Sequence, residues 1–153
     1  MLHVIVQNQA LWYYETVLPK VHPLGQGIAK YVLSRVQDAM RRKYEDGEDI
    51  QPGDVDIGQL PPDIVESFRF DINWAASPSE IHDAEPYWEE VSEDFEEAST
   101  NGYPLFVGRA RVKLPRTRWF RRPRLVLRLV WYVREDAMRD LYLHVFWMKA
   151  RLE

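Results

Sequence analysis

The alternation of apolar and charged residues in the C-terminal third constrains the fold of this chain more than any other feature. From 105 to 114, small or apolar residues occupy the even positions, and the cations Arg109, Arg111 and Lys113 occupy odd ones. This two-residue period predicts a strand with one buried face. The segments 125–133 and 141–152 are apolar strand candidates separated by a short polar stretch at 135–140. A connection this short cannot cross over, so they are predicted to form an antiparallel hairpin.

Large rings occupy both faces of this predicted hairpin. Trp131 and Tyr132 alternate on its first strand, and on the second strand Phe146 is expected opposite Trp147. A strand pair that is apolar on both faces needs a cover on both sides. Either helices of the same domain cover both faces, or one face is an interface with another protein.

The N-terminal part predicts helix after a short strand at 2–6. Between Leu24 and Tyr44, apolar residues recur three and four positions apart, and three cations fill the last turn, as in an amphipathic helix. A second helix is expected to begin at the capping box of residues 77–80, to break at Pro86, and to end near residue 99.

The order of these elements predicts the fold class. Residues 64–74 are expected to form a further strand, so helices dominate early and strands late. We therefore predict an α+β fold, in which an antiparallel β-sheet of three to five strands with a C-terminal hairpin packs with two main helices. The 153 residues show no internal repeat and suit one domain, 1–153, with an acidic, exposed and mobile loop at 45–62.

Composition excludes several classes of protein. The chain has no cysteine, which rules out disulfides, thiolate metal sites and cysteine nucleophiles. The N-terminus lacks the pattern of a signal peptide, and no apolar run is long enough to span a membrane. The expected location is therefore the cytoplasm, for a protein of cellular, viral or phage origin.

The small net charge of −4 conceals a strong separation of charge along the chain. Residues 1–44 carry a net +4, residues 45–101 carry 18 acidic side chains against Arg69 alone, and residues 102–153 carry a net +9. Such a separation indicates binding partners or internal pairing rather than a particular fold.

The basic C-terminal part of the chain, residues 102–153, supplies the first candidate binding residues. Its arginines surround aromatic rings, and the planar guanidinium fork suits phosphate or carboxylate groups. No acidic residue occurs between Gly102 and Arg134. The candidates are Arg109, Arg111, Arg116, Arg118, Trp119, Arg121, Arg122 and Arg124.

The predicted acidic helix supplies the second candidate surface. Glu89 and Glu93, and likewise Glu90 and Asp94, are like-charge pairs four residues apart with no cation between them. Each such pair costs about 0.2–0.5 kcal/mol in an isolated helix. This helix is therefore expected to face positive charge, in the same molecule or in a second copy.

No motif of high specificity indicates catalysis. The histidines are scattered, Gly25-Gln26-Gly27 lacks the spacing of a phosphate loop, and no serine stands in a nucleophile elbow. The sequence predicts no cofactor and no metal site.

The leading hypothesis is a non-enzymatic interaction protein, either an assembly component or an inhibitor of a larger complex, which binds a protein partner or itself. The alternative is a nucleic-acid-binding module that uses the segment Arg116–Arg124. An enzyme without a recognisable motif is the third alternative.

Overall fold

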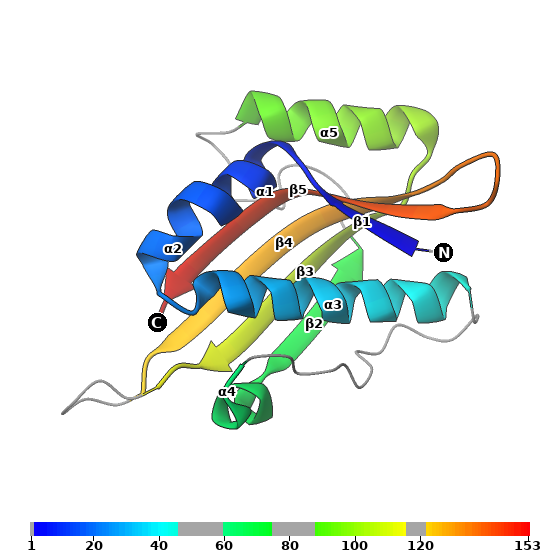
Figure 1. The fold of residues 1–153 in the computed structure, drawn as a ribbon. Coiled ribbons are helices and arrows are strands. Elements are labelled where there is room, and N and C mark those ends of the chain that lie inside the picture. Colours follow the sequence, from blue (N-terminus) through cyan, green and yellow to red (C-terminus); the bar gives the residue numbers. More distant parts are fainter. Residues whose placement is uncertain (1, 46–59, 75–87, 116–121) are drawn as a thin grey trace.

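A five-stranded sheet forms the centre of the fold (Figure 1). The computed structural model describes residues 2–45, 60–74, 88–115 and 122–153. The strand order is β1-β5-β4-β3-β2; β1 runs parallel to β5, and all other neighbours are antiparallel. The strands are β1 (Leu2–Val6), β2 (Arg69–Trp74), β3 (Leu105–Lys113), β4 (Arg124–Glu135) and β5 (Leu141–Leu152).

Helices lie on both faces of this sheet (Figure 1). In the described ranges they are α1 (Asn8–Trp12), the π-helical turn η1 (Tyr13–Val17), α2 (Leu18–Val21), α3 (Gly25–Tyr44), α4 (Pro62–Ser67) and α5 (Trp88–Asn101). The long helix α3 and the segment from α1 to α2 cover one face, and α5 covers part of the other. The predicted α+β class is thus confirmed.

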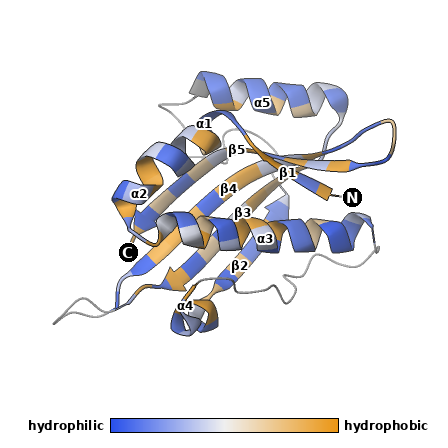
Figure 2. Cartoon of the chain, in the orientation of Figure 1, coloured by the Kyte–Doolittle hydropathy of each residue, from blue (hydrophilic) through white to orange (hydrophobic). Residues whose placement is uncertain are grey.

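Two separate apolar cores result from this arrangement. On the α3 face, Ile28, Val32 and Val36 pack over strand residues such as Leu127 and Leu129, and the strands alternate in hydropathy along their length (Figure 2). On the other face, Val91, Phe95 and Ala98 of α5 pack on rings and aliphatic chains of β4 and β5: Val130, Tyr132, Phe146 and Trp147. The aromatic residues on both faces of the hairpin are therefore covered within the domain.

A bulge in β5 determines which rings face α5. Val130 pairs with Trp147 while the next residue, Trp131, pairs with Val145, so Phe146 is an extra residue in β5. Because of this insertion, Phe146 and Trp147 both contribute to the α5 core, and Val145 and Met148 to the α3 core. The prediction that Phe146 and Trp147 lie on opposite faces is therefore wrong.

Two side chains form hydrogen bonds with the part of the β5 edge that β1 does not reach. Strand β1 pairs only with the first part of β5. Beyond it, the Gln9 amide donates to Met148 O at 2.8 Å and accepts from Met148 N at 2.7 Å. The Tyr13 hydroxyl does the same for Ala150, donating at 3.0 Å and accepting at 2.9 Å. These buried side chains satisfy the backbone groups that a neighbouring strand would pair.

Two details of the predicted architecture need correction. The sheet is not wholly antiparallel, because β1 pairs with β5 in parallel; all the other helices and strands of the described ranges lie between these two strands in the chain. Residues 64–74 are not one strand: Pro62–Ser67 is helical with proline in its first turn, Ser67 Oγ donates to Ile64 O at 2.8 Å, and β2 begins at Arg69. The expected capping box and most of the 45–62 loop lie outside the described residues.

Packing at Gly108 gives a test of the α3 core. A Cβ at Gly108 would lie 2.7 Å from Cζ3 of Trp131, which is fully buried. We expect Gly108→Ala to lower the free energy of unfolding by about 1–3 kcal/mol, because the indole ring has little room to move. Urea unfolding followed by circular dichroism measures this change.

Gly27→Ala is the matched control. At Gly27, in α3, an added Cβ has Leu60 Cδ2 as its nearest neighbour at 3.4 Å, and alanine favours the helix by up to about 1 kcal/mol. This variant should be as stable as the wild type or more so. Equal unfolding midpoints for Gly108→Ala and the wild type would contradict the described packing.

Candidate functional site

The sheet face that carries α5 is open and strongly basic over its remaining area. Helix α5 packs near Val130 and Tyr132, and the strand residues beyond that point are mostly cations. Alternation and strand register place eight of them on this one face. We call this set the basic face: Arg69, Arg109, Arg111, Lys113, Arg124, Arg128, Lys149 and Arg151.

Strand register places these like charges directly beside one another. Arg109 pairs with Arg128 and Arg128 with Lys149, while Arg69 pairs with Arg111. Facing pairs of equal charge destabilise a sheet, so this arrangement costs folding free energy unless an anion offsets it.

Few acidic groups within the described ranges compensate Arg109, Arg111, Arg124 and Arg151 of the basic face. Asp71 pairs in register with Arg109, and Glu153 Oε1 forms an ion pair with Arg151 at 2.8 Å. No ion pair within those ranges joins α5 to Arg109, Arg111 or Arg124. The expectation that the acidic helix faces these arginines in the same molecule is therefore not supported.

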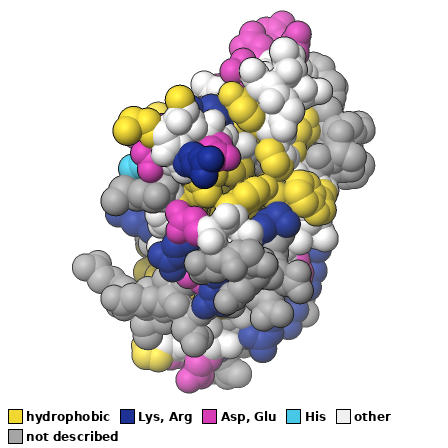
Figure 3. All heavy atoms as spheres, turned by 90° about the vertical axis from the view of Figure 1, so that its right-hand side faces the viewer, with side chains coloured by type: hydrophobic (Ala, Val, Ile, Leu, Met, Phe, Trp, Pro, Cys, Tyr) yellow, Lys and Arg dark blue, Asp and Glu magenta, His cyan; other side chains and the backbone are white. Residues whose placement is uncertain are grey.

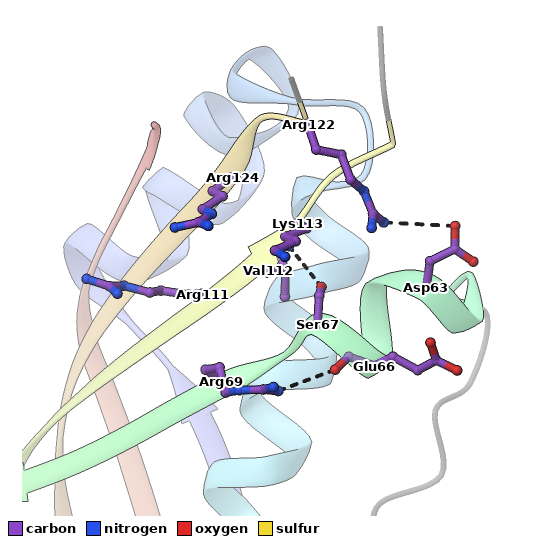
Figure 4. A pocket seen from close by; sticks show the side chains of 9 residues that line it. All are labelled: Asp63, Glu66, Ser67, Arg69, Arg111, Val112, Lys113, Arg122 and Arg124. Carbon is purple, nitrogen blue, oxygen red and sulfur yellow. Dashed lines mark hydrogen bonds and ion pairs between the residues drawn. The ribbon is translucent and has the colours of Figure 1, made fainter. Parts of the chain in front are cut away.

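A pocket of about 450 Å³ opens at the end of the basic face away from α5 (Figure 4). It lies between α4, the start of β2, the end of β3 and the start of β4. Its lining residues are Asp63, Glu66, Ser67, Arg69, Arg111, Val112, Lys113, Arg122 and Arg124. Five cations thus surround a hollow that contains two carboxylates.

Helix α5 presents a stripe of acidic side chains away from the sheet. Glu89, Glu93, Glu96 and Glu97 are exposed, and their spacing places them together on the outer side of the helix. In Figure 3, acidic side chains form the top of the molecule, at the height of α5 in Figure 1. Burial and the charge of Glu93 raise the pKa of the half-buried Glu90. We call Glu89, Glu93, Glu96 and Glu97 the acidic stripe.

Asp94 is not part of this surface, although the sequence suggested it as a binding residue. Its side chain is buried, with 6% of the residue exposed. The Asn8 amide donates to its two oxygens at 3.0 and 2.9 Å, and the Gln7 amide donates at 3.0 Å. Asn8 adopts a left-handed backbone conformation with φ of 56°. Burial raises the pKa of Asp94 despite these donors, so this carboxylate joins α5 to the N-terminal segment and has no free surface for a partner.

The same network continues to His144 in β5. Its Nδ1 lies 2.9 Å from Gln7 Oε1, and its Nε2 accepts a hydrogen bond from Arg134 Nε at 3.1 Å. The ring also stacks on Tyr132 with centroids 4.7 Å apart. Both ring nitrogens are engaged, so this geometry suits a structural histidine rather than a general base.

The structure thus brings together part of the predicted binding set. Arg109, Arg111 and Arg124 lie on the basic face, and Arg122 lies in the pocket at its end. Arg116, Arg118, Trp119 and Arg121 lie outside the described residues. Arg69, Lys113, Arg128, Lys149 and Arg151 were not among the predicted residues; strand register, rather than proximity in sequence, places Arg69, Lys149 and Arg151 beside the others.

The titration of His144 should be visible in the stability of the protein. Burial, and then the charge of Arg134, lower the pKa of His144 to about 4 from 6.5. The unfolded chain therefore takes up a proton first as pH falls, and stability decreases between pH 6.5 and about 4. We expect this histidine to contribute a loss of about 2–3 kcal/mol over that range.

Urea unfolding of the wild type and His144→Gln at several pH values isolates this contribution. Other titrating groups are common to both proteins, so the wild type should show a steeper loss of stability on acidification. Parallel curves would contradict the burial of a neutral imidazole in this network.

Comparison with known proteins finds no matching family model, no matching curated protein and no matching solved structure. In the described ranges, no helix is long and apolar enough to cross a membrane, and no three histidine or carboxylate side chains gather as a metal site would require. The geometry and charge of the basic face and the acidic stripe are the features that bear on function.

Proposed function

We propose that this chain is a non-enzymatic interaction protein that assembles through protein–protein contacts, with the acidic stripe of one copy binding the basic face of another. The observation that carries the proposal is the presence of two oppositely charged surfaces on separate parts of one molecule. Within the described ranges these surfaces form no ion pair with each other.

The charge patterns of both surfaces favour an external counter-charge. The carboxylates of α5 are separated by four residues or fewer without an intervening cation, and cations face one another across the strands. Each like-charge pair opposes folding of the isolated chain. Contact between the two surfaces would relieve both sets of repulsion at once.

The dimensions of the two surfaces are also compatible. Helix α5 has 14 residues, which corresponds to a length of about 21 Å. The basic face spans four strands, which corresponds to a width of about 14 Å between the outer strand axes. A helix can therefore lie along or across this face, and guanidinium groups can bind its carboxylates in pairs.

The proposed contact is heterologous, because the two surfaces differ. Each copy keeps one free basic face and one free acidic stripe after the contact forms. Such contacts produce rings or open chains rather than closed two-fold dimers. An assembly component is the function that this geometry favours.

A pair of charge variants tests this proposal. The first, Arg109→Gln/Lys149→Gln/Arg151→Gln, removes cations outside the pocket; the second, Glu89→Gln/Glu93→Gln/Glu97→Gln, removes exposed carboxylates. We expect wild-type mass to rise with concentration at low salt, because salt screens surface charge. Each variant alone should associate about tenfold more weakly than the wild type, since up to three ion pairs at the partly exposed contact are lost. Light scattering coupled to size exclusion measures the mass.

Mixing the two variants provides the decisive control. Each retains the surface that the other lacks, so an equimolar mixture should form a one-to-one dimer that grows no further. Monomeric wild type at low salt and high concentration would refute self-association. A mixture that stays monomeric while the wild type assembles would refute the pairing of these two surfaces.

Nucleic acid binding is the second candidate function. Arginine supplies six of the eight cations of the basic face, and arginine binds phosphate oxygens through two parallel hydrogen bonds. Against this, α5 brings carboxylates to one end of the same face, where they would repel a phosphate backbone. Wild-type protein that carries nucleic acid, seen by ultraviolet absorbance and lost at high salt, would favour this candidate over assembly.

A further inference from the structure

We infer that the pocket at the end of the basic face is a binding site for a phosphate group. The pocket lies at the junction of α4 with β2, β3 and β4 (Figure 4). Arg69, Arg111, Lys113, Arg122 and Arg124 surround it, against Asp63 and Glu66. The excess of three positive charges matches a dianion better than a single carboxylate.

Two of these arginines donate hydrogen bonds to backbone oxygens, and Arg122 also forms a long ion pair with Asp63. Arg122 Nε donates to Leu114 O at 2.9 Å, and Arg69 Nη1 donates to Phe68 O at 2.8 Å and to Glu66 O at 3.3 Å. These bonds orient each guanidinium group and neutralise none of its charge. Preorganised forks of this kind lose less conformational freedom when an anion binds.

One donor of the pocket is both buried and unused. Arg122 Nη2 has no hydrogen-bond partner in the described part of the chain. The nearest carboxylate oxygen, Oδ2 of Asp63, lies 3.9 Å away, too far for a hydrogen bond, and that side chain is 72% exposed. A buried donor without an acceptor costs about 1–3 kcal/mol. A small shift of the Arg122 side chain that brings Nη2 to the pocket surface would let an oxygen of a bound phosphate remove this cost.

The remaining cations would complete the site by turning toward it, because the guanidinium groups of Arg111 and Arg124 point away from Arg122 (Figure 4). Arg111, Lys113 and Arg124 are exposed, and Lys113 and Arg124 lie opposite each other in register. Ser67 Oγ already accepts from Lys113 N at 2.9 Å and donates to Ile64 O at 2.8 Å, so it shapes the pocket wall. The hydrogen bonds to an anion would come from the arginines and the lysine.

Distance from the acidic helix makes this end of the face suitable for a phosphate. From Arg124 at the pocket to Val130 under α5 the strand rises about 20 Å. This exceeds the screening length of about 8 Å at physiological ionic strength. The carboxylates of α5 therefore do not repel an anion here. The inference does not rest on assembly, because the pocket is formed within one copy.

Isothermal titration calorimetry with inorganic phosphate tests the site. The titration is made at about pH 7.5, where phosphate is mostly a dianion, with ionic strength held constant by chloride. We expect saturable binding of one phosphate per chain. Arg111→Gln/Arg124→Gln should weaken it by about tenfold or more, because two charge-assisted hydrogen bonds are lost from exposed side chains.

Two control variants separate site binding from general attraction of anions. Arg109→Gln/Lys149→Gln/Arg151→Gln removes more charge from the basic face but leaves the pocket intact, so phosphate affinity should change by about twofold or less. Arg111→Lys/Arg124→Lys keeps the charge and loses the planar fork, and should bind with intermediate affinity. Equal loss in the first control and in Arg111→Gln/Arg124→Gln would overturn the site, as would the absence of saturable binding.

Two further ligands identify the source of the phosphate group. O-phosphoserine in a short peptide and adenosine monophosphate are titrated in the same buffer. Tighter binding of either one than of inorganic phosphate, lost in Arg111→Gln/Arg124→Gln, supports the site and names the class of its ligand. Binding of either that survives in this variant contradicts the site. Failure here leaves the proposed assembly intact, because that proposal is tested by the mass of the charge variants.

Discussion

The antiparallel pairing of β4 with β5 is the interaction on which the rest of the structure depends. The bulge at Phe146 directs two consecutive rings, Phe146 and Trp147, toward α5 while Val145 and Met148 remain in the α3 core. One strand pair thereby holds apolar layers on both sides. The parallel strand β1 and the side chains of Gln9 and Tyr13 complete its outer edge.

The restricted area of α5 creates the charged surface of the protein. The helix covers the sheet only where β4 and β5 present aromatic and aliphatic side chains, and beyond that region the same strands carry cations. One end of this sheet face is therefore an apolar contact with α5, and the other end carries cations that repel one another. The basic face is a consequence of this division, and the like charges that it places side by side oppose folding of the chain.

Buried polar groups connect α5 to the sheet more specifically than apolar packing could. Asp94 accepts from Gln7 and Asn8, and Gln7 also contacts His144. Burial disfavours the charged forms of Asp94 and His144 alike. The hydrogen bonds to Asp94 fix the position of α5, because a shift of the helix would leave a buried carboxylate without its donors.

Local periodicity and composition were sufficient to predict the α+β class, the helix now seen as Gly25–Tyr44, the C-terminal hairpin and the separation of charge. They could not place Arg69 beside Arg111, or β1 beside β5, because strand register and parallel pairing join residues far apart in the chain. Tertiary structure also decided that Asp94 is buried whereas Glu93 is exposed. Only the packed helix defines which side of an acidic sequence faces the core, and only the sheet defines which arginines share a face.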